Sequence, residues 1–366
     1  MSAHIHTIFN STSDLSSDAE GFYKNYWSES GMVKKETLLK NKAIIERFYP
    51  GGISGKTILE IGVGGEGGIL LQLMNNNDVH GMDVSDSAIN NCRRFGLPVT
   101  KANLDSDAIP FQPETFDIVF AFEVFEHFSN PQHAAEEIRR ILKPGGIFIS
   151  SVPATCTYHW PRLFYASLFE TENFKDFLMA NEFRVTCLDD WLIQNSYRRY
   201  NLPERVKSWS WYFRAEKLAT SDALGYLELG QHFWNKRNEF GLRIRPVEAV
   251  DLFRKSLKLT PDNQETKLLT THALLYRAIN GDRDEFCSLT NEIMNGLMMP
   301  DTPNKAQCLS RLLIIHVEGC RLGLPIFSPE EFVSLRSQLE QASGTQSLVD
   351  EIRREEEISR RLAEIA

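Results

Sequence analysis

Between residue 34 and about residue 218, short apolar segments alternate with segments whose apolar residues recur three or four positions apart. The short segments predict strands, and the longer periodic segments predict helices. We expect strands over 57–61, 79–83, 98–102, 116–121, 146–152, 183–188 and 209–216, and helices over 34–48, 67–76, 86–94, 131–142 and 174–181. This alternation predicts an α/β domain in which helices cover both faces of a mainly parallel sheet.

The pattern changes at about residue 219, after which amphipathic helices follow one another to residue 366. The segment 247–263 resembles the second helix of a tetratricopeptide repeat, with Ala249, Phe253 and Leu257 at the packing positions and Pro261 at its end. The repeat-like helices extend over about 223–282, which is one repeat and a fragment. A solenoid needs about three repeats. We therefore expect a helical bundle with one repeat-like hairpin.

These patterns divide the chain into three parts. Residues 1–30 form an irregular N-terminus, 31–218 form the α/β domain, and 219–366 form an all-helical C-terminal extension. The N-terminal part carries an aromatic cluster at 20–27, which either caps one edge of the core or forms a lid over a bound ligand.

Composition excludes several classes of function. The net charge of −9 argues against a nucleic-acid partner, because such partners are bound mainly through Lys and Arg. The six cysteines are scattered without a C-x-x-C pair, so neither a zinc site nor a disulfide framework is predicted. The chain shows no signal-peptide pattern and no apolar run of about 18 residues. We expect a soluble, cytoplasmic protein with no membrane partner.

The most informative motif joins the first expected strand to the helix that follows it. Segment 57–61 is apolar, and a glycine-dense turn that includes Gly62 and Gly64 comes directly after it. Glycine lets the backbone approach a ligand closely, because a Cβ atom would occupy the space that the ligand needs. A strand, a glycine turn and a helix in this order predict a ligand at the helix N-terminus.

Acidic residues around this turn indicate the kind of ligand. Glu60 precedes the glycines, Glu66 lies within the turn, and Asp83 ends the second expected strand. A carboxylate at the tip of that strand is well placed to bind a ribose diol. Glu60 and Glu66 would repel a pyrophosphate but suit a ligand that carries an ammonium and a sulfonium group. The charges therefore disfavour an NAD-dependent oxidoreductase, which is the competing class of enzyme.

Further motifs follow in order along the chain. They are Ile109-Pro110-Phe111 with Phe116-Asp117-Ile118-Val119, then Glu126-His127, then Leu142-Lys143-Pro144-Gly145-Gly146. Together with Glu60-x-Gly62-x-Gly64 and Asp83, this set resembles the class I S-adenosylmethionine-dependent methyltransferases that modify small molecules, over roughly residues 20–218. The resemblance implies a Rossmann-like, seven-stranded methyltransferase sheet whose last strand enters antiparallel between the fifth and sixth.

The resemblance also implies S-adenosylmethionine as the cofactor and a set of binding residues. Glu60, Gly62 and Gly64 would line its methionine part, and Asp83 would bind the ribose hydroxyls. The remaining candidates for cofactor binding are Asn103 and Asp105, either of which would meet the adenine amine, and Glu123 after the fourth strand.

One departure from the family pattern concerns the glycine turn itself. The family usually has a third glycine two residues after Gly64, whereas here Glu66 stands at that position and Gly67 follows, as if one residue were inserted.

Candidate catalytic residues follow the fourth expected strand, in the segment 123–127. His127 can accept a proton near neutral pH. In the alternative interpretation, Glu126 and His127 are a structural pair that fixes the loop. The pattern Glu123-x-x-Glu126-His127 also occurs in quinone-biosynthesis O-methyltransferases, where the family implies a divalent cation. Because relatives without a metal share the pattern, we expect no metal here and keep a metal-assisted O-methyltransferase as an alternative.

The acceptor pocket is expected to use the segment after the fifth strand, residues 153–162. Tyr158 and Trp160 offer stacking and hydrogen bonding to a ring or a sugar, and Arg162 offers a positive charge for an acidic group. His159 is a second candidate base. The alternative is that the two aromatic residues only anchor the next helix.

We therefore expect a methyltransferase that acts on an oxygen, or less readily a nitrogen, of a small metabolite, a natural-product intermediate or a glycan. The helical extension would cover the acceptor site, form a homodimer or contact a carrier protein. The alternative from another class is a cofactor-binding scaffold whose repeat-like helices recruit a protein partner.

Overall fold

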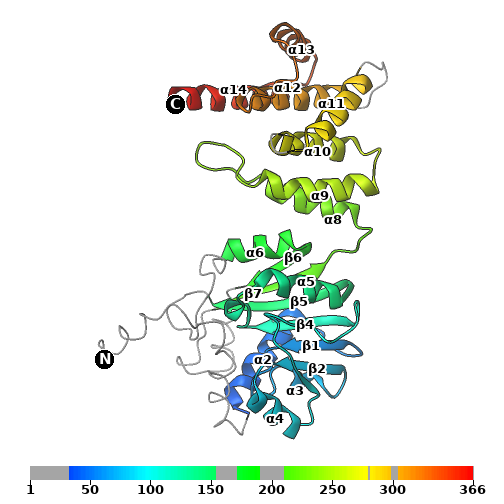
Figure 1. Cartoon of the computed structure of the whole chain (residues 1–366), viewed down its shortest axis with the longest axis vertical. Coiled ribbons are helices and arrows are strands. Elements are labelled where there is room, and N and C mark those ends of the chain that lie inside the picture. The colour runs from blue at the N-terminus through cyan, green and yellow to red at the C-terminus, as the bar shows by residue number, and fades with distance from the viewer. Residues whose placement is uncertain (1–32, 154–170, 190–209, 279–280, 298–303, 366) are drawn as a thin grey trace, which may run out of the picture. The chain divides into compact units, whose positions relative to one another are not determined.

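The computed structural model describes residues 33–153, 171–189, 210–278, 281–297 and 304–365. The chain divides into two compact units, Met1–Ala219 and Thr220–Ala366 (Figure 1).

The first unit is built on one seven-stranded sheet with the order β3-β2-β1-β4-β5-β7-β6. Its strands are β1 (Thr57–Ile61), β2 (Asp78–Asp83), β3 (Val99–Lys101), β4 (Phe116–Phe122), β5 (Leu142–Pro153), β6 (Phe183–Asp189) and β7 (Ser210–Lys217). Strands β1 to β5 are parallel, and β7 runs antiparallel to both β5 and β6. The predicted fold class and the antiparallel insertion of the last strand are both confirmed.

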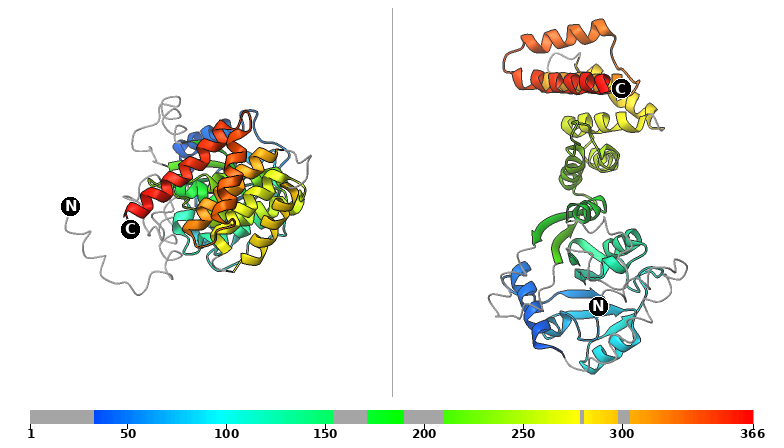
Figure 2. Two further views of the ribbon diagram at one scale, coloured as in Figure 1. Left: turned by 90° about the horizontal axis from the view of Figure 1, so that it is seen from above. Right: turned by 90° about the vertical axis from the view of Figure 1, so that its left-hand side faces the viewer.

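Helices cover both faces of this sheet (Figures 1 and 2). Neighbouring residues of a strand point to opposite faces, so Ile58 packs with α2 (Lys35–Phe48), α3 (Leu70–Leu73) and α4 (Asp86–Arg94). Leu59 packs on the other face with α5 (Pro131–Ile141) and α6 (Thr171–Ala180). Both side chains are fully buried, so the two faces form two apolar cores.

The helix after β1 is shorter than the sequence pattern predicted. A helix over 67–76 was expected, but α3 covers only Leu70–Leu73. Gly67 and Gly68 have φ angles of 79° and 55°, which lie in the left-handed region and cannot form part of a right-handed helix. The glycine turn is therefore longer than its apolar pattern indicated.

The second unit contains, in its described part, helices that pack against their neighbours in succession. They are α8 (Ala223–Trp234), α9 (Pro246–Leu259), α10 (Gln264–Ala278), α11 (Arg283–Leu297), α12 (Lys305–Arg321), α13 (Pro329–Gln341) and α14 (Gln346–Ile365). Helix α8 packs closely on α9, and a Cβ atom at Gly230 would lie 2.5 Å from the ring of Phe253. The likeness to tetratricopeptide repeats stays a prediction.

Charged residues are buried inside this helical unit. Arg243 lies over the ring of Trp234, 3.6 Å from its centroid, and its Nε lies 3.6 Å from Oε1 of the fully buried Glu318. His272 Nε2 lies 3.0 Å from Oε2 of the same carboxylate. These contacts tie the connection between α8 and α9 to α10 and α12.

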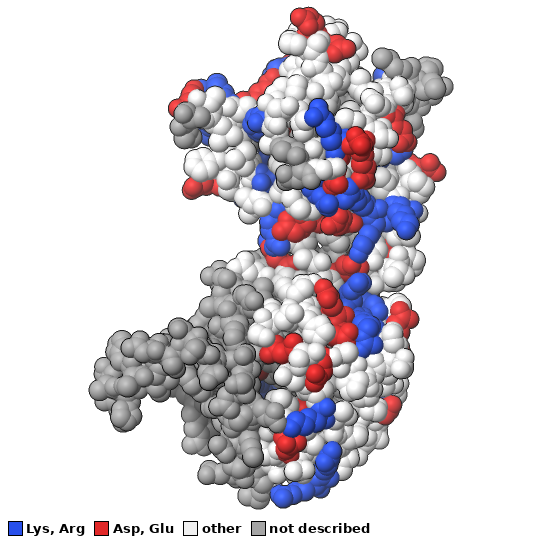
Figure 3. Space-filling view, in the orientation of Figure 1, with Lys and Arg blue, Asp and Glu red and all other residues white. Residues whose placement is uncertain are grey.

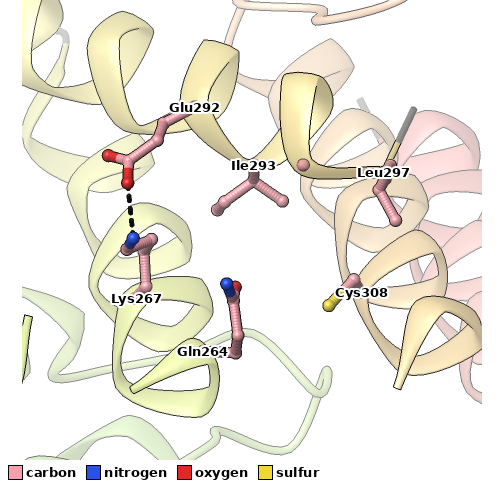
Figure 4. Close-up of a pocket in the computed structure, with 7 residues that line it drawn as sticks. Gln264, Lys267, Glu292, Ile293, Leu297 and Cys308 are labelled. Atoms are coloured by element: carbon pink, nitrogen blue, oxygen red, sulfur yellow. Dashed lines mark hydrogen bonds and ion pairs between the residues drawn. The ribbon is translucent and has the colours of Figure 1, made fainter. Parts of the chain in front are cut away.

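A cavity of about 250 Å³ lies among α10, α11 and α12 (Figure 4). Ile293, Leu297 and Cys308 form part of its wall, and Lys267 is ion-paired with Glu292 beside it. In the part of Figure 3 that is not grey, acidic and basic side chains are interspersed among uncharged residues. Among the described residues, none of the helices has the length and apolar character that crossing a membrane requires.

Candidate functional site

The glycine turn lies at the carboxyl end of β1, between β2 and β4. Gly62 and Gly64 have φ angles of 72° and 67°, which other residues rarely adopt. A Cβ atom at Gly62 would lie 2.5 Å from Cγ2 of Val124, so the turn packs directly against the loop that follows β4. In open parallel sheets, ligands bind at this edge, where helices leave in opposite directions from adjacent strands.

Asp83 at the end of β2 faces the glycine turn. Its Oδ2 accepts a hydrogen bond from the Gly64 N–H at 2.9 Å, and its Oδ1 accepts one from the Ser85 N–H at 2.8 Å. Burial raises the pKa of Asp83, and these two backbone donors oppose the rise. A carboxylate has about four acceptor positions, so capacity remains for a hydroxyl of a ribose.

The side chain of Glu60, in β1, stabilises the glycine turn. Its carboxylate is buried and accepts a hydrogen bond from the Ile69 N–H at 2.9 Å. A Cβ atom at Gly68 would lie 2.1 Å from Glu60 Oε2, so only glycine fits at that position. Burial raises the pKa of Glu60 to about 8.

The loop after β3 carries Asn103 and Asp105. Asp105 Oδ1 accepts hydrogen bonds from the backbone N–H groups of Ser129 and Asn130, at 2.7 and 3.2 Å, and so joins this loop to the start of α5. Asn103 Oδ1 accepts a hydrogen bond from the Asp105 N–H at 3.1 Å. Both residues lie at the carboxyl edge of the sheet.

Glu123, Glu126 and His127 lie just beyond the end of β4. Glu123 has a φ of 54°, and its Oε1 accepts a hydrogen bond from the Ser151 hydroxyl at 2.7 Å. His127 Nε2 lies 3.8 Å from Glu126 Oε1. A non-glycine residue held in the left-handed region is a form of strain that often occurs at functional sites.

The carboxyl group of Glu126 is fully buried, and in the described part of the chain neither of its oxygens has a hydrogen-bond partner. Burial, and next the charge of Glu123, raise the pKa of Glu126 well above its ordinary value. An unpartnered buried acid is costly. Its position at the ligand edge of the sheet makes it a functional candidate.

The metal interpretation requires Glu123, Glu126 and His127 to converge on one point. In the part of the chain that the structure describes, no three His, Cys, Asp or Glu side chains form a group that fits a metal ion. Glu123 accepts a hydrogen bond from Ser151. The described residues thus do not gather the three side chains into such a group, and we derive no reaction step through a cation.

The candidate acceptor residues Tyr158, His159, Trp160 and Arg162 lie outside the described residues, as does the aromatic segment 20–27. Sequence reasoning missed the part played by Ser151, a buried polar residue of β5, and nothing in its surrounding sequence distinguished it. The sequence also did not predict a partner for Glu66, although the extra residue in the glycine turn marked this position as unusual.

The sheet order and the glycine turn opposite Asp83 define a Rossmann-like methyltransferase fold. A family model described as a methyltransferase domain matches residues 59–150. The ubiquinone biosynthesis O-methyltransferase of Paraburkholderia xenovorans is 30% identical over 193 residues, covering 50% of this chain and 73% of that protein. The chain therefore belongs to the class I S-adenosylmethionine-dependent methyltransferases, and S-adenosylmethionine is its methyl donor.

Two further relatives differ from each other in the reaction that their names describe. The ubiquinone biosynthesis O-methyltransferase of Photorhabdus laumondii is 35% identical over 145 residues, covering 36% of this chain but only 58% of that protein. The sterol 24-C-methyltransferase of Schizosaccharomyces pombe is 31% identical over 160 residues, covering 39% of this chain and 40% of that protein. The acceptor is therefore a separate question from the family.

Proposed function

We propose that this enzyme transfers the methyl group to a hydroxyl oxygen of a small metabolite, a natural-product intermediate or a glycan. The observation that carries the proposal is the buried Glu126, which has no hydrogen-bond partner among the described residues and lies beside Glu123 and His127, next to the glycine turn. A hydroxyl group must lose a proton when it is methylated, and this cluster supplies a base with a negative neighbour. Two relatives named as O-methyltransferases support the choice of oxygen.

We assign the donor to the edge formed by β1, β2 and β3. The backbone at Gly62 and Gly64 would lie against its methionine part, with Glu60 holding the turn in shape. Asp83 would accept a hydrogen bond from a ribose hydroxyl. Asn103 and Asp105 both stay candidates for the adenine amine, since Oδ1 of each already accepts backbone hydrogen bonds.

The donor supplies an activated methyl group, whose bonding electrons return to sulfur when the methyl leaves. In our proposal His127 takes the hydroxyl proton as the new oxygen–carbon bond forms. Burial and the charge of Glu123 raise the pKa of Glu126, whose Oε1 lies 3.8 Å from His127 Nε2, so this carboxyl group lies beside the imidazolium that forms on His127. Ser151 fixes the Glu123 carboxylate in this arrangement.

The test uses labelled S-adenosylmethionine and fractionated small-molecule extract, followed by mass spectrometry and NMR of the labelled product. We expect a methyl ether. A methyl group found on nitrogen or carbon would contradict the proposal. If the donor binds but is not consumed with any fraction, the alternative of a scaffold that recruits a protein partner gains support.

The metal-assisted alternative has its own test. Because the three donor side chains do not converge, we expect turnover to stay within about twofold after treatment with a chelator. In a metal-assisted enzyme, activity would be lost on chelation and restored by Mg²⁺.

A further inference from the structure

Glu66, the residue that departs from the family's glycine pattern, is directed at helix α2. Its Oε1 lies 3.0 Å from Lys34 Nζ, and its Oε2 accepts a hydrogen bond from the Thr37 hydroxyl at 2.6 Å. Only 7% of Glu66 is exposed, although it belongs to a turn at the carboxyl edge of the sheet. We call these two interactions the Glu66–α2 contact.

The Glu66–α2 contact lies at the N-terminal end of α2. Lys34 is the N-cap residue of α2, its side chain makes no capping hydrogen bond, and Thr37 lies in the first helical turn. The first turn of a helix has unsatisfied N–H groups and a partial positive charge. A carboxylate at this end stabilises the helix, so Glu66 supplies from the glycine turn a negative charge beside the N-cap position, which a lysine occupies.

Two more side chains join α2 to the same short segment. Asn41 Nδ2 donates to the Gly68 carbonyl at 2.7 Å, and Gln72 Nε2 donates to the Leu38 carbonyl at 2.6 Å. Thr37 and Asn41 are four residues apart and therefore lie on one face of α2. Residues 66–72 are thus held along one side of the helix.

The opposite side of the segment is held by β1. Glu60 accepts from the Ile69 N–H, and its carboxylate fills the space beside Gly68. Two carboxylates therefore hold the backbone between Gly64 and Ile69. Glu60 holds it from β1, and Glu66 holds it through its contacts with α2. A displacement of α2 would change this backbone, because Gly67 and Gly68 offer it many other conformations.

We propose that Glu66 is a positioning residue that couples the placement of α2 to the shape of the donor-binding turn. The inference rests on the proposed binding of the donor at this turn, and it adds a means of regulating donor binding. Coupling is reciprocal, so donor binding stabilises the docked position of α2 to the same extent that docking favours the donor. Anything that loosens α2 then weakens donor binding.

The test compares S-adenosylhomocysteine binding by calorimetry in the full chain and in Glu66→Gln and Thr37→Val. We expect each variant to bind about 5- to 30-fold more weakly, within the range of coupling between linked sites. The double variant should lose less than the product of the two single losses, because both changes break one contact. Glu46→Gln is the matched control, since Glu46 also pairs with a lysine of α2, Lys42.

Hydrogen exchange separates coupling from simple loss of stability. In the wild type, S-adenosylhomocysteine should slow exchange of the hydrogen-bonded amides of α2 from Leu38 onward, and in Glu66→Gln this slowing should vanish while the protection of β1 and α4 remains. The proposal is overturned if both variants bind within twofold of the wild type, or if ligand-induced protection of α2 survives in Glu66→Gln. A product methylated on nitrogen would refute only the choice of oxygen.

Discussion

At the scale of single residues, the site combines carboxyl groups whose burial favours the protonated form. Glu126 has no hydrogen-bond partner among the described residues, while Glu60 and Asp83 accept backbone hydrogen bonds within the glycine turn. Acidic groups in such settings titrate at higher pH than in water. The site should therefore respond to pH above the range in which exposed carboxyl groups titrate.

His127→Ala should lower kcat about 10²- to 10⁴-fold if this residue takes the acceptor's proton, because general bases contribute rate factors of this size. Binding of S-adenosylhomocysteine should be unchanged within about twofold, since the imidazole is assigned to the acceptor and not to the donor. Turnover assays and calorimetry give the two values. An unchanged kcat would leave His127 with a structural role only.

Glu60 makes a testable contribution to the pH dependence of stability. Its pKa is about 8 in the folded chain, against 4.5 when exposed to water. Between these values the folded chain holds a proton that the unfolded chain has lost, so the free energy of unfolding falls as pH rises through this window.

We therefore expect Glu60→Gln to gain stability relative to the wild type as pH rises from 5 to 8, measured by thermal melts without ligand. The amide keeps an acceptor for the Ile69 N–H but cannot ionise. Parallel melting curves for the two proteins across this range would contradict the raised pKa of Glu60.

At the scale of elements, the glycine turn is the part that tolerates least change. Its conformation depends on left-handed backbone angles and on the space that Glu60 fills beside Gly68. The neighbouring elements, β1 and α2, are ordinary in comparison, and their apolar residues pack in the sheet's cores.

Gly68→Ala and Gly55→Ala separate the effect of space from the effect of backbone angle. Both glycines have positive φ, but a Cβ atom at Gly55 meets nothing within 4 Å, whereas one at Gly68 would clash with the Glu60 carboxylate. Gly55→Ala should cost about 1 kcal/mol of unfolding free energy in urea titrations. Gly68→Ala should cost at least about 2 kcal/mol more, as overpacking does, and should weaken S-adenosylhomocysteine binding. Equal losses would show that Glu60 moves aside freely.

At the scale of the whole molecule, all described residues assigned to the donor belong to the first unit. Residues 1–219 expressed alone should therefore bind S-adenosylhomocysteine within about threefold of the full chain and melt cooperatively. Calorimetry and thermal melts check both expectations. A large loss of affinity would mean that the helical unit contributes to the donor site.

Residues 220–366 have a charged interior that an isolated helical bundle does not require. Glu318 of α12 meets His272 and Tyr276 of α10 and Arg243 of the connection between α8 and α9. Buried ionic groups stabilise less than apolar packing, but they specify one arrangement of the helices. Whether this unit dimerises or contacts a carrier protein stays a prediction.

Much of the fold could be predicted from the sequence because the relevant signals are local. The period of apolar residues marked the strands, and Gly62, Gly64 and Asp83 marked the ligand edge. The length of α3 could not be predicted, because the left-handed angles at Gly67 and Gly68 depend on Glu60 and on packing from both sides.

The sequence by itself determined the α/β class, the order of motifs and the charge of the ligand site, because each depends on residue type and spacing. Only the tertiary structure decided which carboxylates are buried, that Ser151 meets Glu123, and that Glu66 joins the glycine turn to α2. These partners are 28 and 29 or more residues apart along the chain, and their contacts exist only once the sheet has formed. Burial and long-range pairing set the chemistry of the site, and neither is a property of a sequence segment.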